Sequence, residues 1–300
     1  MLEETRRFLI FVLILSAMSV LLSEIRSVNR GFLFADSGMS QEDRQKLSQR
    51  EDLTDRYLRF VKGMVTFDLG LTESGELVLA HLASRFWPTF HLASFAIIGS
   101  VLGSLILAFF SLSTVNVAPQ KFLNILSQLI LSTPVFVVAI LLLVVFFLIL
   151  GWLPPGGYES WNISFVILPG IALGSRVWAR LYRFTFRLAE TELEGEYVRV
   201  LRARGYSEQR ILYRHILLKI LPVLLVLILL DFSSLLSGAI VVEEIFFFPG
   251  IGKSMYHAIR TMDSSLLAAL LFYSGLIFYL MGRISEKVRD RLLGWEEEAK

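Results

Sequence analysis

Long apolar segments alternate with shorter charged segments along most of the chain. A helix needs about 20 apolar residues to cross the roughly 30 Å of hydrocarbon in a bilayer. Six segments approach or exceed that length, namely residues 8–23, 90–112, 122–150, 163–182, 220–242 and 264–282. The pattern predicts an all-α, polytopic membrane protein with six transmembrane helices.

Composition agrees with this prediction and narrows the chemistry. Of the 300 residues, 55% are hydrophobic, whereas only about half of a soluble chain is apolar even when glycine is counted. Cysteine is absent, which excludes disulfides, zinc–thiolate sites and cysteine nucleophiles. The four histidines are scattered without metal-ligand spacing, so no metal site is expected. A net charge of +2 gives no basis for a nucleic-acid partner.

Basic residues are distributed unequally among the connecting segments. Ten Lys and Arg residues lie between positions 176 and 219 and five follow position 282, whereas none lies between 151 and 162. Because short cytoplasmic loops carry the excess of basic residues, both termini are predicted to be cytoplasmic. A cleavable signal peptide is the alternative for the first segment, but Glu3 and Glu4 dilute its basic start and no small-x-small cleavage site follows Leu22.

These patterns divide the chain into four parts. We expect a first transmembrane helix over 1–23, an outer loop over 24–88, a five-helix core over 89–282 and a cytoplasmic tail over 283–300. Within the outer loop, alternating charged and apolar residues predict a surface helix over 40–62. A second amphipathic helix is predicted over 77–86, lying on the membrane before Pro88 begins the second span. The outer loop is either a solvated cap or a docking surface for an external partner.

Proline and arginine positions add detail to the third and fourth spans. Pro134 lacks a backbone N–H and is expected to kink the third span. Arg176, Arg180, Arg183 and Arg187 recur at intervals of four, three and four residues, so they share one helix face. That face either binds lipid headgroups or faces a cytosolic partner.

A charged segment, residues 190–219, separates the fourth and fifth spans. Apolar residues from Leu193 to Leu201 follow helical spacing. Gly205 can adopt the left-handed conformation that ends a helix, and Ser207 can cap the next one. The segment therefore predicts two helices joined by a glycine elbow on the cytoplasmic side.

Two further groups are candidates for a translocation path or gate. Asp231 lies at the centre of the fifth span, where an ionised carboxylate has to face protein or water. It either pairs with a neighbouring helix or lines a path, where it could attract a cationic solute. The second group follows that span and comprises Glu243, Phe248, Pro249 and Gly250. These residues form either an outer gate or an interfacial anchor.

Short motifs occur both in the charged segment and along the rest of the chain. In and just after the charged segment they are Tyr197-Val198-Arg199, Arg202-Ala203-Arg204-Gly205, Arg214-His215 and Pro222. Elsewhere they include Asp68-Leu69-Gly70, Thr133-Pro134-Val135-Phe136, Gly151-Trp152-Leu153-Pro154, Gly238-Ala239-Ile240-Val241-Val242-Glu243 and Phe248-Pro249-Gly250-Ile251-Gly252. In this order they resemble the landmarks of inner-membrane permease subunits of the dipeptide, oligopeptide and nickel ABC importer family, with its EAA-type coupling loop. The resemblance covers residues 53–282.

The resemblance implies the type I ABC importer permease fold in a multi-pass protein of the cell inner membrane that transports peptides or similar small solutes. It implies a second homologous permease subunit, two cytoplasmic ATPase subunits that bind ATP, an external substrate-binding protein and the lipid bilayer as partners. This chain would then bind no cofactor and would not be an enzyme. The residues implied in ATPase coupling are Glu196, Tyr197, Arg199, Arg202, Ala203, Arg204, Gly205 and His215.

Some features depart from the family pattern, and two other classes of function stay open. Arg199-Val200-Leu201 stands where the family has a Glu-Ala-Ala triplet, and the Pro-Gly-Asp-Pro motif after the first span is absent. Residues 250–254 end like a phosphate-binding loop, but Phe247 occupies the place of its first glycine. The alternatives are a secondary transporter with Asp231 as its ion or proton site, which would need an ion gradient and no ATP, and a noncatalytic membrane scaffold.

Overall fold

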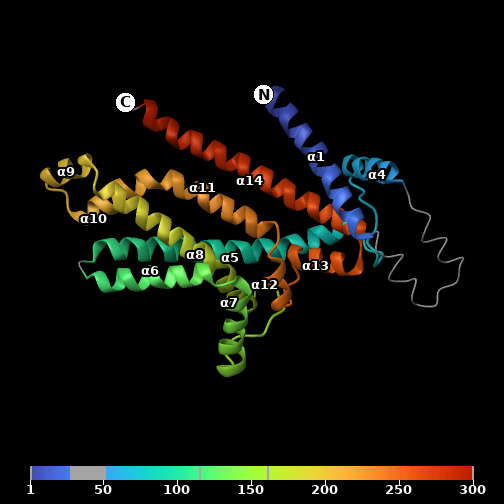
Figure 1. Ribbon diagram of the computed structural model, residues 1–300, viewed down its shortest axis with the longest axis horizontal. Coiled ribbons are helices and arrows are strands. Elements are labelled where there is room, and N and C mark those ends of the chain that lie inside the picture. The colour runs from blue at the N-terminus through green and yellow to red at the C-terminus, as the bar shows by residue number, and fades with distance from the viewer. Residues whose placement is uncertain (1, 28–51, 115, 161, 299–300) are drawn as a thin grey trace, which may run out of the picture.

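The computed structural model describes residues 2–27, 52–114, 116–160 and 162–298, and within these ranges the chain is helical without a β-strand (Figure 1). In chain order the elements are α1 (Leu2–Ser27), α4 (Leu53–Thr66), α5 (Val78–Ser113), α6 (Val117–Ser132), α7 (Val135–Leu142), η1 (Leu143–Ile149), α8 (Ser164–Leu193), α9 (Glu196–Ala203), α10 (Glu208–Arg210), η2 (Ile211–Ile216), α11 (Leu217–Leu236), α12 (Ile240–Ile245), α13 (Ile251–Thr261) and α14 (Ser264–Glu298). The two η elements are π-helices. The all-α prediction is confirmed.

The long helices lie roughly along one axis of the molecule (Figure 1). α8 packs against α5, α6 and α11, while α14 packs against α11 and α1. α9 and α10 occupy one end of the long axis, and α4 and α13 occupy the opposite end (Figure 1). The charged segment and α4 of the outer loop therefore lie at opposite ends of the helical layer (Figure 1).

Within the described ranges, four helical stretches are long and apolar enough to cross a membrane: Glu3–Glu24, Val78–Ser113, Glu208–Leu236 and Ser264–Arg291. The pair formed by α6 and α7–η1 counts as a fifth if its two bent halves are taken together. α8, which carries four arginines, is not among these stretches. The structure thus supports a polytopic membrane protein with four to five apolar spans.

α5 and α8 approach each other closely because small residues line their contact. A Cβ atom added at Gly174 of α8 would lie 3.1 Å from the carbonyl oxygen of Ala96 in α5. Ser100 Oγ of α5 is 2.7 Å from the Gly174 carbonyl oxygen and 2.6 Å from that of Ala96. Small residues and short polar contacts are the usual means of packing helices in a membrane, where lipid tails are as apolar as the side chains.

The third predicted span is broken more sharply than a kink. Thr133 adopts the extended conformation that a residue before proline prefers, with ψ of 130°. Pro134 has no N–H to continue the hydrogen bonds of the helix. α7 and η1 therefore leave α6 at an angle of 106°. As a result, α7 and η1 project away from the helical layer (Figure 1).

Helices continue through three positions where the sequence predicted a boundary. Pro88 does not begin a helix, since α5 starts at Val78 and takes in residues 78–86 of the predicted second amphipathic helix. Pro222 does not interrupt the helix, since α10, η2 and α11 follow one another without a gap. α14 also continues past position 282 into the predicted tail. A proline costs a membrane helix little where neighbouring helices cover its turn, and both prolines are buried.

The described part of the outer loop contains the predicted turn. α4 ends at Thr66, its C-cap residue Phe67 adopts a left-handed φ of 55°, and Gly70 follows with φ of 82°. The N–H of Gly70 donates to Asp68 Oδ1 at 3.1 Å. The predicted surface helix corresponds to α4 from position 53 onward, and its residues 40–51 lie outside the described residues.

Candidate functional site

The segment between α8 and α11 forms a tight elbow at one end of the molecule. α9 ends at Ala203, and Gly205 then adopts a left-handed φ of 81°. The Gly205 N–H donates to the carbonyl oxygen of Arg202 at 2.9 Å. Ser207 Oγ accepts from the N–H of Arg210 at 3.4 Å, which caps the next helix. The predicted order of helix, glycine turn and helix is confirmed, although Leu193 belongs to α8 and the first helix of the elbow begins at Glu196.

The inner face of this elbow is apolar and covered. Val198 of α9 is 0% exposed, as are Ile211 and Ile216 of η2. All three belong to one cluster with Phe109 of α5. Burying one such side chain stabilises a fold by about 1.5–3 kcal/mol. Apolar packing therefore holds the elbow against the long helices.

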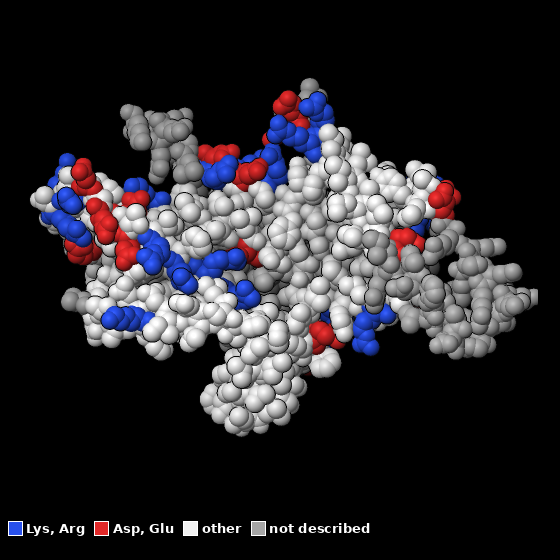
Figure 2. Space-filling model, in the orientation of Figure 1, with Lys and Arg blue, Asp and Glu red and all other residues white. Residues whose placement is uncertain are grey.

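The outer face of the elbow carries most of the predicted coupling residues. Exposed side chains or backbone on this face belong to Glu196, Arg199, Ala203, Arg204 and Gly205. Basic and acidic side chains alternate over this end of the molecule (Figure 2). A polar groove of about 670 Å³ separates α9 from the inner ends of α5 and α8 and is lined in part by Arg199 and Glu190.

Arg202 is exposed, but its guanidinium is engaged within the elbow. Arg202 Nε and one terminal nitrogen donate to the two carboxylate oxygens of Glu208, at 2.6 and 3.0 Å. This bidentate contact closes the glycine turn from α9 to α10. The hydrogen bond from Arg202 lowers the pKa of the Glu208 carboxyl below its usual value. Arg202 therefore holds the elbow's shape.

Tyr197 and His215 face inward. Tyr197 Oη donates to Glu192 at 3.0 Å, and Lys219 Nζ lies 2.6 Å from the same carboxylate and 4.5 Å from the centre of the Tyr197 ring. Burial, aided by the bond to Glu192, raises the pKa of the Tyr197 hydroxyl well above its usual value. The His215 ring packs edge-on against Tyr206, 5.5 Å between centroids. These two residues position the elbow on the adjoining helices.

Sequence reasoning missed several residues of this site. Glu192 and Lys219 are 27 positions apart, and no local pattern indicates that they meet. Val200 is 51% exposed, although its helical spacing suggested burial. The Arg202–Glu208 pair could have been predicted from the sequence, because a glycine turn between two helices brings residues on either side of it together.

Asp231 is paired with an arginine of the neighbouring span. Its side chain is 6% exposed and forms an ion pair with Arg180 of α8, whose side chain is 48% exposed. Asp231 Oδ2 is buried without a hydrogen-bond partner among the described residues. Of the two expected roles, the pairing with a neighbouring helix is the one this geometry supports.

The remaining arginines of α8 stay on the surface. Arg176, Arg183 and Arg187 are exposed, and Arg187 lies 3.7 Å from Glu190. A line of basic side chains crosses the middle of the helical layer (Figure 2). An arginine at the centre of a membrane helix costs roughly 2.5–3.5 kcal/mol on the insertion scale. Contact of this face of α8 with lipid tails at the level of Arg176 would therefore be costly.

The predicted gate residues are buried at the junction of α5, α12 and α13. Glu243 is 0% exposed and accepts from the N–H of Lys253 at 2.9 Å and from Thr89 Oγ1 at 3.1 Å. Phe248 is 0% exposed in an apolar cluster. A Cβ atom at Gly250 would lie 2.4 Å from Glu243 Oε2, and Pro249 beside it is half-buried. Their role as a gate stays a prediction.

Glu243 acts as the cap of α13. The N-cap residue Gly250 has no side chain to offer, and the first N–H groups of a helix need acceptors. Burial raises the pKa of the Glu243 carboxyl, while its hydrogen bonds to Lys253 and Thr89 oppose that rise. Because this carboxylate already fills the helix terminus, residues 250–254 are not open to a phosphate.

Replacing Glu243 by alanine is expected to lower the free energy of unfolding by about 1–3 kcal/mol, because buried N–H groups lose their acceptor. Glu243→Gln retains one acceptor oxygen and should lose less. The measurement is the midpoint of thermal unfolding of the purified complex. Glu244→Ala is the matched control, since this neighbour is half-buried. Equal midpoints for the two alanine variants would contradict the capping role.

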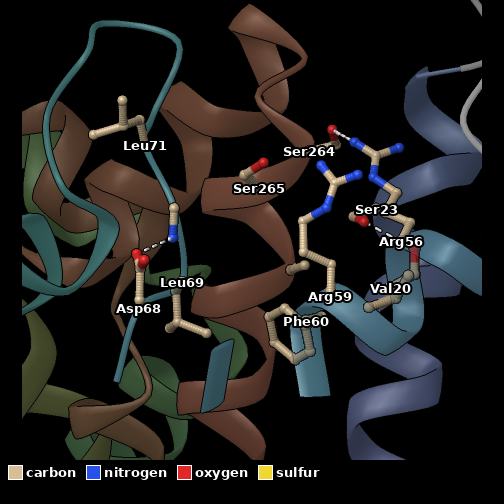
Figure 3. A pocket seen from close by; sticks show the side chains of 12 residues that line it. Val20, Ser23, Arg56, Arg59, Phe60, Asp68, Leu69, Leu71, Ser264 and Ser265 are labelled. Carbon is tan, nitrogen blue, oxygen red and sulfur yellow. Dashed lines mark hydrogen bonds between the residues drawn. The ribbon is translucent and has the colours of Figure 1, made fainter. Parts of the chain in front are cut away.

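A second polar cavity lies at the opposite end of the molecule, among α1, α4 and α14 (Figure 3). It has a volume of about 350 Å³ and is lined by Arg56 and Arg59 together with Ser264 and Ser265. The guanidinium of Arg56 donates to both Glu24 and Ser264, and so connects α4 to α1 and α14. Among the described residues, no group of three or more His, Asp or Glu side chains is placed to bind a metal ion, here or elsewhere.

The membrane-length helices, the ion pair between α8 and α11 and the charged elbow at one end are the features of a polytopic membrane protein. Residues 100–292 match the family model of the binding-protein-dependent transport system inner membrane component. The chain belongs to this family, and it is a permease subunit of an ABC importer in the inner membrane.

Similar proteins and structures agree with this membership. The glutathione transport system permease protein GsiC of Escherichia coli (strain K12) is 30% identical over 251 residues, which is 83% of this chain and 81% of that protein. GsiC of Pectobacterium atrosepticum is 31% identical over 248 residues, which is 82% and 80% of the two chains. A chain of the MetNI methionine ABC transporter, solved in inward-facing conformations, has a TM-score of 0.54 at 16% identity and covers 70% of this chain and 97% of its own. That last likeness shows a shared fold.

Proposed function

We propose that this chain forms one half of the translocation path of an ATP-driven importer of peptides or similar small solutes. The α9–α10 elbow carries the proposal, because it combines an exposed charged edge with an apolar inner face fixed to α5 and α11. The relatives named as glutathione permeases favour a peptide as the solute.

The exposed edge of the elbow docks on a cytoplasmic ATPase subunit. Glu196, Arg199, Ala203, Arg204 and Gly205 form the contact surface, and Tyr197, Arg202 and His215 hold its shape. Two such ATPases bind the ATP, and this chain hydrolyses none. A second permease subunit completes the path, and an external substrate-binding protein delivers the solute. Closure of the ATPases then moves the elbow as a rigid body.

The chain crosses the membrane six times with both termini inside. The antiparallel packing of α1 and α14 supports this topology: Glu4 pairs with Arg283 at one end, whereas Glu24 and Ser264 both contact Arg56 at the other. The basic elbow lies at the end opposite α4 (Figure 1), and basic loops favour the cytoplasm. α8 and the bent α6–α7 pair complete the six spans.

The ion-coupled alternative has less support. A proton or ion site needs a carboxylate that is free to bind, and Asp231 is already paired with Arg180. A scaffold without transport would have no need of a charge pair inside the membrane, where charged residues are costly.

Charge reversal on the elbow tests the proposal. The double variant Arg199→Glu/Arg204→Glu is expected to reduce co-purification of the ATPase subunits by at least about tenfold, since like charges across an interface cost several kcal/mol. ATP-dependent uptake into proteoliposomes should fall in parallel. Both residues are exposed, so the permease should still fold and insert.

Arg260→Glu is the matched control, because Arg260 is exposed on α13 at the opposite end. This variant reverses one charge outside the elbow, and it should leave ATPase binding intact. Wild-type ATPase recruitment by the double variant would overturn the proposed coupling.

A further inference from the structure

We propose that the face of α8 carrying Arg176, Arg180 and Arg183, called here the arginine face, lines the translocation path and attracts solutes of net negative charge. This inference rests on the proposed function and adds a substrate class to it. The preferred solute carries more carboxylates than amines, as a small acidic peptide does.

The depth of the arginine face supports this placement. Arg176 lies about 18 Å along α8 from Ser164, and Asp231 lies about 21 Å along α11 from Leu217, at 1.5 Å rise per residue. The Arg180–Asp231 pair therefore lies well inside the helical layer. If α8 enters the hydrocarbon at Ser164, roughly 30 Å of hydrocarbon ends near position 184, and Arg176 lies about 12 Å short of that level. Water or protein has to solvate its exposed guanidinium.

The charge on this face does not cancel. Asp231 neutralises Arg180, and Glu190 lies beside Arg187, while Arg176 and Arg183 form no ion pair with a described residue. The helices packed against α8 supply little acid: between His91 and its end α5 has no charged residue, and α6 has Lys121. α12 has two acidic residues, of which Glu243 is occupied with capping α13 and Glu244 is half-buried. The face thus has a net positive charge inside the layer.

A water-filled path accounts for this charge better than a sealed interface does. In a pair of homologous permease subunits related by an approximate two-fold axis, a surface of one subunit that lies near the axis approaches the corresponding surface of the other. Two arginine faces in direct contact would repel, whereas an aqueous path between them both hydrates the guanidinium groups and concentrates anions. Notably, the pairing with Arg180 leaves Asp231 unable to attract a cation.

Thiol chemistry tests the inference without knowledge of the natural solute, since the chain contains no cysteine. Arg176→Cys would be expressed in the assembled complex, with partner subunits made cysteine-free, and treated with membrane-impermeant methanethiosulfonates of opposite charge. We expect modification, with the anionic reagent favoured by roughly tenfold over the cationic one after each rate is normalised to free cysteine, because clefts of one sign raise local counter-ion concentration. Adding Arg183→Gln should reduce this preference severalfold.

Leu102→Cys is the matched control, because Leu102 is an apolar residue of α5 that is 56% exposed, and it should stay unmodified. An unreactive thiol at position 176 in an assembled complex would mean that the face is sealed, and equal normalised rates would mean that the path does not select anions; either result overturns the inference. Arg183→Cys serves as the second reporter if Arg176→Cys does not assemble. A further outcome is a thiol at position 176 that prefers the anionic reagent while charge reversal on the elbow leaves ATPase binding unchanged. That result would contradict the proposed coupling and would still support the arginine face as part of the path.

Discussion

Replacing Arg180 by alanine is expected to be the most destabilising single change in the membrane layer, at about 3–5 kcal/mol, because it leaves a buried carboxylate without its counter-charge. Asp231 is 5% exposed, so water does not replace the lost guanidinium. The measurement is unfolding of the purified permease in mixed micelles of increasing SDS fraction, with the free energy extrapolated to zero SDS.

The two partners of the pair should not be equivalent. Asp231→Ala leaves Arg180, which is 48% exposed, so its guanidinium keeps water and the loss should be smaller. The double variant Arg180→Met/Asp231→Leu should recover much of the stability, since replacing both charges by apolar groups is often neutral. If Arg180→Ala and Asp231→Ala lowered the free energy of unfolding equally, the difference in burial between the two side chains would not explain the stability of the pair.

Gly205→Val is expected to abolish ATP-dependent uptake while leaving the permease inserted in the membrane. No atom lies within 4 Å of an added Cβ at this position, so the effect comes from the left-handed φ of 81° and not from a clash. A β-branched residue forced into that conformation costs about 1–3 kcal/mol. The elbow is expected to relieve the strain by reopening between α9 and α10, which displaces Arg199 and Arg204. Uptake and ATPase co-purification are the measurements.

Gly205→Asn is the matched control, because asparagine adopts left-handed conformations far more readily than other residues with a side chain. It should retain most of the uptake. If valine and asparagine behaved alike, bulk at the docking surface would explain the loss better than backbone strain does.

Local signals in the sequence were enough for the elbow. Gly205, Ser207 and the apolar spacing before them act over a few residues, and the turn forms where these short-range preferences agree. The spacing of the four α8 arginines likewise predicted one exposed face. The apolar segments predicted a polytopic membrane protein, because a membrane span is defined by length and composition, but four to five of the six predicted spans are long and apolar enough among the described residues.

Contacts between distant positions could not be predicted in this way. Arg180 and Asp231 are joined by the packing of α8 against α11, and nothing near either residue specifies the partner. Proline was also ambiguous: Pro134 turns the chain by 106°, whereas Pro88 and Pro222 lie inside continuous helices. The difference comes from tertiary packing, since the latter two are buried among neighbouring helices.

The unbroken course of α10, η2 and α11 makes this part of the chain a lever. From Glu208 to Leu236 it is about 43 Å long at 1.5 Å per residue, so a tilt of about 10° would move its far end by roughly 7 Å. α11 ends at Leu236, and at Gly238, two residues further on, an added Cβ would lie 2.7 Å from the Gly252 nitrogen of α13. A small rotation imposed on the elbow would therefore shift the backbone that leads to Glu243 and Phe248.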